Sequence, residues 1–119
     1  MRALIYLPNI ILIYGGKLKI YLDDLRIEPK GWRRTYTVEE TIELLKTRQV
    51  EELSLDNDLG DGLQEGFRVL DFLEEVIFND PTFPIPKMNV HSSNEGRAPS
   101  MRKIIKKLEM IRQTQTGDS

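Results

Sequence analysis

The chain has 119 residues, of which 39% are hydrophobic and 30% charged, as is typical of a single soluble globular domain. It contains no Cys and one His, which excludes disulfides, thiolate zinc sites, a cysteine nucleophile and a multi-histidine metal site within one chain. The formal net charge of −2 does not favour a broad nucleic-acid-binding surface, which is normally basic. The lack of Cys fits a reducing compartment, and we expect a cytoplasmic protein.

Residues 1–16 are an apolar segment that differs from the rest of the chain. Its apolar run is shorter than the ~20 residues that a membrane span requires, so we expect no membrane partner. The segment can form two short strands turned at Pro8-Asn9, or be an extension upstream of the domain. A signal peptide is possible by length, but only Arg2 supplies a basic region and no small-x-small cleavage site follows. We assign it no function, and we place the domain at residues 17–113 and a disordered tail at 114–119.

Strands and helices alternate from residue 17 onward. Residues 17–22, 50–55 and 87–90 are predicted strands, because each is a short segment with apolar residues that ends at a polar cluster. Residues 32–36 are predicted as a short edge strand, because two arginines among β-forming residues suit an edge better than a sheet centre.

Three helices separate or follow these strands. Thr37 and Glu40 have the spacing of a capping box, which predicts a helix from Val38 to about Gln49. Residues 66–79 carry a wide apolar stripe at helical spacing, which is typical of a helix buried against a sheet. The core face of a final helix consists of Met101, Ile104, Ile105, Leu108 and Ile111. This alternation implies an α/β fold with a parallel sheet and right-handed crossovers.

Polar clusters follow three of the predicted strands. The first is Asp23 with Asp24, the second is Asp56 with Asp58 in the run DNDLGDG, and the third begins at His91. Because the carboxyl ends of parallel strands share one edge of the sheet, we expect the three clusters to converge in one crevice. Clustered carboxylates repel unless a cation or shared protons compensate. The pattern therefore predicts a site for Mg²⁺ or another divalent cation, with the four aspartates as ligands.

The same clusters supply candidate catalytic and phosphate-binding groups. Asp56 is a candidate nucleophile, because a carboxylate beside a metal can accept a phosphoryl group, and His91 is a candidate general acid or base. Ser92, Asn94 and the backbone N–H groups that enter the last helix are candidates for holding phosphate oxygens, with Arg97 as a clamp. Plainer interpretations remain open: strand-ending turns, a hydrogen-bonded buried histidine, capping residues and a surface salt bridge.

The arrangement resembles the receiver domains of two-component response regulators. Asp23 and Asp24 match the acidic pair of those domains, Asp56 matches their phosphoacceptor, and Gly66 resembles the glycine that opens the next helix. The sequence differs from those receiver domains in two respects. Residues 26–30 are too short for the helix expected between the first two strands, and a fifth strand with the receiver lysine has no counterpart. The resemblance implies a receiver-like (flavodoxin-like) single domain, a parallel sheet flanked by helices that lacks the last strand-helix unit.

From residue 17 to about 108 the chain more closely resembles the cyclic-phosphate-processing receiver-like domains. The shared motifs are Leu22-Asp23-Asp24, Thr37 to Glu40, Ser54 to Gly60, and His91 to Asn94 followed by Gly96 and Met101. This resemblance implies a metal-dependent phosphoesterase that acts on a cyclic or terminal phosphate, with a phosphate-containing small molecule or an RNA end as its partner. The alternatives are a non-catalytic phosphoacceptor or phosphate-sensing module that binds a protein partner, and an interaction module whose aspartates only cap a loop.

Overall fold

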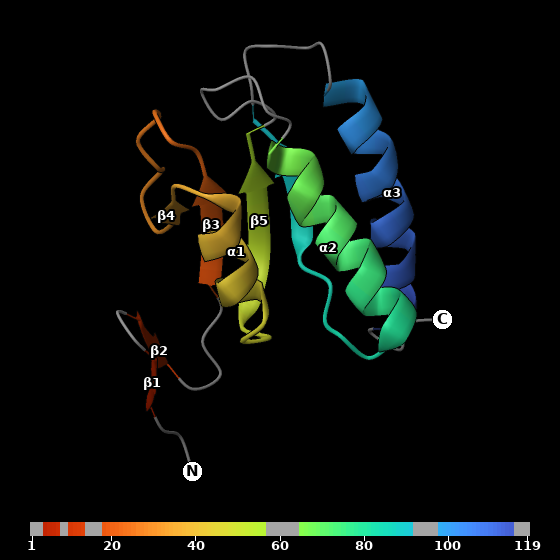
Figure 1. Cartoon of the computed structure of the whole chain (residues 1–119), viewed down its shortest axis with the longest axis horizontal. Coiled ribbons are helices and arrows are strands. Elements are labelled where there is room, and N and C mark those ends of the chain that lie inside the picture. The colour runs from red at the N-terminus through yellow and green to blue at the C-terminus, as the bar shows by residue number, and fades with distance from the viewer. Residues whose placement is uncertain (1–3, 8–9, 14–17, 57–64, 92–97, 116–119) are drawn as a thin grey trace.

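The computed structural model describes residues 4–7, 10–13, 18–56, 65–91 and 98–115 (Figure 1). In chain order the elements are β1 (Leu4–Leu7), β2 (Ile10–Ile13), β3 (Leu18–Leu22), β4 (Arg33–Thr35), α1 (Val38–Leu45), β5 (Val50–Leu55), α2 (Glu65–Asn79), β6 (Lys87–Val90) and α3 (Ala98–Gln115). None of the described helices is long and apolar enough to cross a membrane. The strands β1 and β2 pair antiparallel with each other, as expected if the N-terminal segment forms two short strands.

The remaining strands form one four-stranded parallel sheet in the order β4-β3-β5-β6. β4 lies at the edge, as its two arginines predict, and residues 23–32 connect it to β3 without a helix. The predicted receiver-like parallel sheet is therefore confirmed, including the missing helix after the first strand of this sheet. The order also places the ends of β3 and β5 side by side at the centre.

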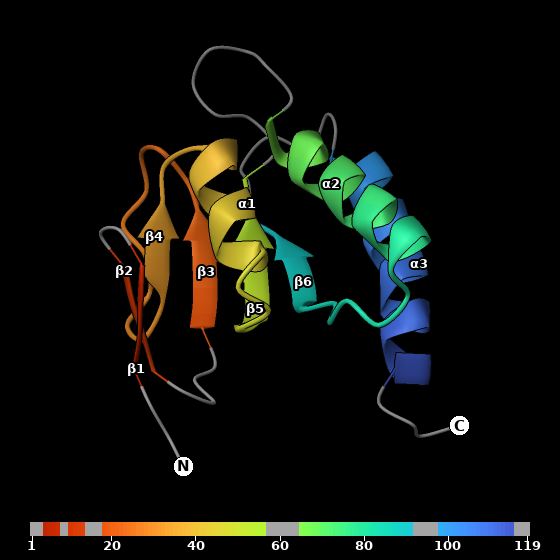
Figure 2. The ribbon, with the colours of Figure 1, turned by 60° about the horizontal axis from the view of Figure 1, so that its bottom comes forward.

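The two faces of the sheet differ in chemistry because side chains alternate along each strand. Ile20 and Leu22 of β3 and Leu53 and Leu55 of β5 are buried in one core with residues of α1 and α2. Figures 1 and 2 show these two helices packed on the same face of the sheet, with α3 beyond β6. The alternate positions, such as Tyr21 and Ser54, point to the opposite face.

The helix α1 begins as predicted but ends earlier. The Thr37 hydroxyl accepts a hydrogen bond from the Glu40 N–H at 3.1 Å, and the Glu40 carboxylate accepts one from the Tyr36 N–H at 2.9 Å, one residue before the usual position. The helix stops at Leu45 rather than near Gln49. The backbone of Arg48 takes a φ of 62°, a left-handed conformation that ends a helix.

The end of α3 also differs from the expected boundary. The helix continues to Gln115, beyond the predicted domain end at residue 113. The Gln115 side chain explains the extension, because it donates to the carbonyls of Pro81 and Phe83 and accepts from the Ile85 N–H. These bonds fasten the end of α3 to the connection before β6.

Candidate functional site

The described residues of the predicted polar clusters meet at one edge of the sheet: Asp23 and Asp24 after β3, Asp56 after β5 and His91 after β6. The backbone ladder continues past the strand ends, since the Asp56 N–H donates to the Leu22 carbonyl at 3.1 Å and the His91 N–H donates to the Leu55 carbonyl at 2.9 Å. These bonds hold the residues that follow the three strands in register. Asp23, Asp56 and His91 are thus positioned by the sheet itself, which supports precise side-chain placement.

Three of the four predicted metal ligands lie together. Asp23, Asp24 and Asp56 each offer a carboxylate oxygen, and these oxygens lie within 4.8 Å of one another. The Asp24 Oδ1 atom is buried and has no hydrogen-bond donor among the described residues. Leaving a buried carboxylate oxygen unpaired is unfavourable, and a divalent cation would satisfy it. The donor set therefore fits a hard cation that prefers oxygen ligands.

Asp23 is the most constrained carboxylate of this cluster. Its side chain is 1% exposed, its Oδ1 accepts from the N–H groups of Leu25 and Arg26 at 2.8 Å each, and its Oδ2 lies 3.0 Å from His91 Nε2. Burial alone would raise the pKa of Asp23, but the two backbone hydrogen bonds and His91 together lower it below its ordinary value. Asp23 therefore stays ionised, and it is oriented before any cation binds.

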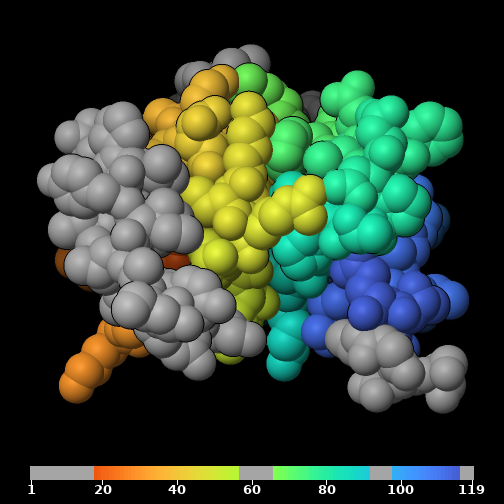
Figure 3. Space-filling model, turned by 90° about the horizontal axis from the view of Figure 1, so that it is seen from below, coloured from red at the N-terminus to blue at the C-terminus, as the bar shows by residue number. Residues whose placement is uncertain are grey.

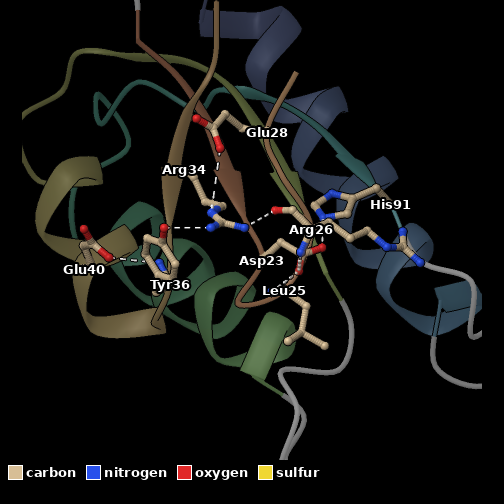
Figure 4. A network of polar contacts seen from close by, with 8 residues as sticks. All are labelled: Asp23, Leu25, Arg26, Glu28, Arg34, Tyr36, Glu40 and His91. Atoms are coloured by element: carbon tan, nitrogen blue, oxygen red, sulfur yellow. Dashed lines mark hydrogen bonds and ion pairs between the residues drawn. The ribbon is translucent and has the colours of Figure 1, made fainter. Parts of the chain in front are cut away.

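His91 is held on three sides, and Figure 4 shows the side that faces Asp23. Its Nε2 faces Asp23, its Nδ1 lies 2.6 Å from the Ser54 hydroxyl, and its ring stacks on Tyr21 with centroids 3.9 Å apart and planes 7° apart. Burial lowers the pKa of His91, while the hydrogen bond and the charge of Asp23 oppose this shift and the positive charge of Arg26 adds to it. The net shift is downward, so His91 releases its proton more readily than a histidine in water.

Ser54 links His91 to the next strand. Its side chain is buried, and its Oγ lies 2.6 Å from Asn89 Oδ1 as well as 2.6 Å from His91 Nδ1. A hydroxyl has a single proton to donate. When His91 is neutral and donates from Nε2 to Asp23, the Ser54 hydroxyl can donate to Nδ1. When His91 is protonated, Nδ1–H donates to Ser54, whose hydroxyl then donates to Asn89.

The site residues predicted from the sequence do not include Tyr21, Ser54, Asn89 or Arg26. Tyr21 pairs with Ser54 and Ser54 with Asn89 in the strand register, so the three lie in one row across the sheet. A signal was available, because residues two positions before a strand-ending aspartate or histidine point to the same face of the sheet. The other predicted site residues, Asp58, Ser92, Asn94 and Arg97, lie outside the described residues.

Comparison with known families agrees with this geometry. A family model described as the cyclic-phosphate processing receiver domain matches residues 18–107. The chain belongs to this receiver family. A comparison of this chain with curated proteins and with solved structures found no match. In this receiver domain the acidic cluster and His91 come from the segments LDD, SLD and HS, which end or follow three adjacent strands.

Proposed function

We propose that this receiver domain is a metal-dependent phosphoesterase that acts on a cyclic or terminal phosphate, carried by a small molecule or an RNA end. The observation that supports it best is the pairing of His91 with Asp23 at the rim of the carboxylate cluster. A proton donor beside a candidate cation site can serve phosphate-ester cleavage, because the donor protonates the leaving oxygen and a cation stabilises the charge on phosphate. The family match supports the same substrate class.

The carboxylates of Asp24 and Asp56, with that of Asp23, would hold Mg²⁺ or another divalent cation. A bound cation would supply positive charge to the phosphate oxygens and orient the ester. Asp23 has both oxygens engaged by hydrogen bonds, whereas Asp24 presents a buried oxygen without a donor among the described residues. Asp24 is therefore the better direct ligand, and Asp23 positions His91.

The chain's own groups can then divide the reaction into two steps. An oxygen of Asp56 attacks phosphorus, the bond from phosphorus to the leaving oxygen breaks, and protonated His91 gives a proton to that oxygen. Water next attacks the same phosphorus, the bond to Asp56 breaks, and neutral His91 takes a proton from the water. The sum of the two steps is addition of one water to the ester, and both residues return to their starting states.

Hydrolysis of a ribonucleoside cyclic monophosphate with Mg²⁺ present tests this proposal. The His91→Ala variant should lose roughly 10²–10⁴-fold in turnover, because it lacks the general acid and base. Its affinity for Mg²⁺ should change little, since carboxylates form the cation site. Asp71→Ala, which truncates an exposed side chain of α2 away from the site, is the surface control and should keep full activity.

A second candidate function follows from the place of Asp56 at the end of β5 in a receiver-like sheet. A non-catalytic phosphoacceptor would incorporate phosphate from acetyl phosphate at Asp56 and would hydrolyse no ester. In that case His91→Ala would leave the labelling intact. Labelling of both proteins without turnover in either would therefore replace the esterase proposal with this one.

A further inference from the structure

Arg26 follows the acidic pair, and its backbone is fixed on both sides. Its N–H donates to Asp23 Oδ1 at 2.8 Å, and its carbonyl oxygen accepts a hydrogen bond from the Arg34 guanidinium. Arg34 is itself held by the Tyr36 hydroxyl at 2.7 Å and lies 3.7 Å from the Glu28 carboxylate. The Arg26 side chain therefore starts from a defined place beside the carboxylate cluster.

The side chain of Arg26 extends over the aromatic part of the site. In Figure 4 it runs past the His91 ring, and its guanidinium group lies beyond it. That group interacts with the Tyr21 hydroxyl, and its positive charge contributes to the lowered pKa of His91. Tyr21 stacks on His91 and meets the Trp32 ring edge-on at 6.3 Å between centroids. The Arg26 guanidinium therefore lies by the stacked Tyr21 and His91 rings, and His91 in turn contacts Asp23 of the cluster.

Arg26 differs from other arginines in its ionic partners. Arg34, Arg48, Arg68 and Arg112 each form an ion pair with a carboxylate. Arg26 is exposed and forms no ion pair within the part of the chain that the structure describes. An exposed guanidinium on an ordered support, without a carboxylate partner there, retains its capacity to bind an anion.

Charge in the site indicates what that anion is. The carboxylates of Asp23, Asp24 and Asp56 carry −3 together when ionised, and one divalent cation reduces the total only to −1 while His91 is neutral. An approaching phosphate would still meet net negative charge, which is unfavourable at short range. The guanidinium of Arg26 brings the total to zero. Its planar fork can also donate two parallel hydrogen bonds to two phosphate oxygens.

We infer that Arg26 is a phosphate-binding residue of this site, an anion clamp whose guanidinium donates hydrogen bonds to the substrate's non-bridging oxygens beside the cation. This inference rests on the proposed phosphoesterase function and adds a residue that the sequence patterns did not identify. Arg26 grips the phosphate in the ground state, so its removal affects substrate binding as well as turnover. Lysine cannot replace it fully, because an ammonium group lacks the planar two-donor geometry.

Inorganic phosphate is the probe, titrated by calorimetry into protein saturated with Mg²⁺. Arg26→Gln should weaken phosphate binding by about 10–100-fold, the effect expected from losing hydrogen bonds to a charged group. Arg26→Lys should fall between this variant and the native protein. Mg²⁺ affinity of Arg26→Gln should be unchanged or higher, because a neighbouring positive charge has been removed. The backbone bond from residue 26 to Asp23 survives in both variants, and circular dichroism checks the fold.

Arg48→Gln is the matched control, because it removes the same charge at the opposite end of the sheet. Arg48 precedes β5 and pairs with Asp80 at 2.7 Å. Figure 3 views that end of the molecule, where the α1–β5 connection in yellow meets the segment after α2 in green-cyan. Arg48→Gln should bind phosphate and Mg²⁺ as the native protein does.

The outcomes separate this inference from the function on which it rests. Equal phosphate affinity in Arg26→Gln and native protein would overturn the inference, as would a native protein that binds Mg²⁺ and no phosphate. Native protein that binds both ligands but hydrolyses no ester would refute the esterase and leave the clamp supported. Native protein that binds no Mg²⁺ would refute the metal site. The inference about Arg26 would then hold only if phosphate binds without Mg²⁺ and Arg26→Gln weakens that binding.

Discussion

The Oδ2 atom of Asp23 and the Nε2 atom of His91 lie 3.0 Å apart, although 68 positions separate the residues in the chain. The pairing of β3 with β5 and of β5 with β6 brings them together. The negative charge of Asp23 favours the protonated form of His91, whereas burial of the ring favours the neutral form. The balance between these effects sets how stability depends on pH.

Stability of the cation-free protein should fall as the pH drops below neutral. The pKa of folded His91 is lowered from the ordinary 6.5, whereas the unfolded chain keeps the ordinary value. The unfolded state then binds more protons in this window, so His91 contributes stability above pH 6.5 that is lost as the pH falls through the folded pKa. Urea unfolding with a chelator present, measured from pH 7.5 down to about 5, checks the slope.

The single His of the chain makes this test specific. In His91→Gln the slope between neutral pH and about 5 should flatten, because no other side chain ordinarily titrates there. Asp23, whose pKa is also lowered, contributes in the same direction only below its ordinary value of 3.8. Stability that rises on acidification through pH 6.5 would instead show that the charge of Asp23 outweighs burial of the ring.

Much of this site was predictable, because it depends on where strands end. Three polar clusters after three strands of a parallel sheet must meet at one edge, and Asp23, Asp24 and Asp56 do so. The bond between Ser54 and His91 was not predictable, because it depends on a side-chain rotamer and on the row that Ser54 shares with Asn89. From the sequence alone, Ser54 is only a strand residue.

Element boundaries were the less predictable part of the fold, for a physical reason. The sequence predicts that α1 extends to about Gln49, but the helix ends at Leu45 and the backbone of Arg48 is left-handed. The pattern of α3 fades before Gln115, yet three side-chain hydrogen bonds to a distant segment keep that residue helical. Both boundaries depend on individual backbone and tertiary interactions, which outweigh local periodicity.

Mg²⁺ should stabilise the protein against unfolding. A cation that binds only the folded state adds roughly 2.7 kcal/mol at a hundred times its dissociation constant. The added stability should disappear in Asp24→Ala and in Asp56→Ala, because each removes a carboxylate of the cluster. Thermal unfolding across a Mg²⁺ titration measures it, and Asp71→Ala on the exposed face of α2 should respond as native protein does.

The cation-free cluster should be strained by repulsion among its carboxylates. Asp56→Asn removes one negative charge and nearly keeps the shape, so without Mg²⁺ it should be as stable as the native protein or more so. With Mg²⁺ present the order should reverse, because the variant has lost a ligand charge. Urea unfolding under both conditions measures the reversal. A clear loss of stability without Mg²⁺ would mean that Asp56 is a structural acceptor instead.

The Thr37 cap should contribute measurably to the stability of α1. Its hydroxyl accepts the Glu40 N–H, and Thr37→Ala leaves that donor without its partner. The expected loss is about 1 kcal/mol, typical of an N-cap residue replaced by alanine. Thr37→Ser keeps the hydroxyl and should be close to native. Chemical unfolding of the three proteins decides this, and equal losses in both variants would assign the effect to the missing methyl group.

Ser54 should determine how His91 is oriented. The hydroxyl can donate to the neutral ring or accept from the protonated one, so it serves His91 in either state. Removing it in Ser54→Ala leaves a largely buried Nδ1 atom without a partner, at a cost of about 1–3 kcal/mol in unfolding free energy. The imidazole of the variant should also populate the Nδ1–H tautomer more than in native protein, because of the two contacts that favour Nε2–H only that with Asp23 remains.

Nitrogen chemical shifts of His91 distinguish this orienting role from a simple loss of packing. In native protein above the His91 pKa, Nε2 should carry the proton and Nδ1 should show the shift of an acceptor. In Ser54→Ala the two shifts should move towards each other, and turnover should fall while the Mg²⁺ affinity persists. Ser54→Thr restores a hydroxyl and should recover both the shifts and the rate. An unchanged tautomer in Ser54→Ala would show that Asp23 alone sets the ring, because no other contact of the variant would distinguish the two nitrogens.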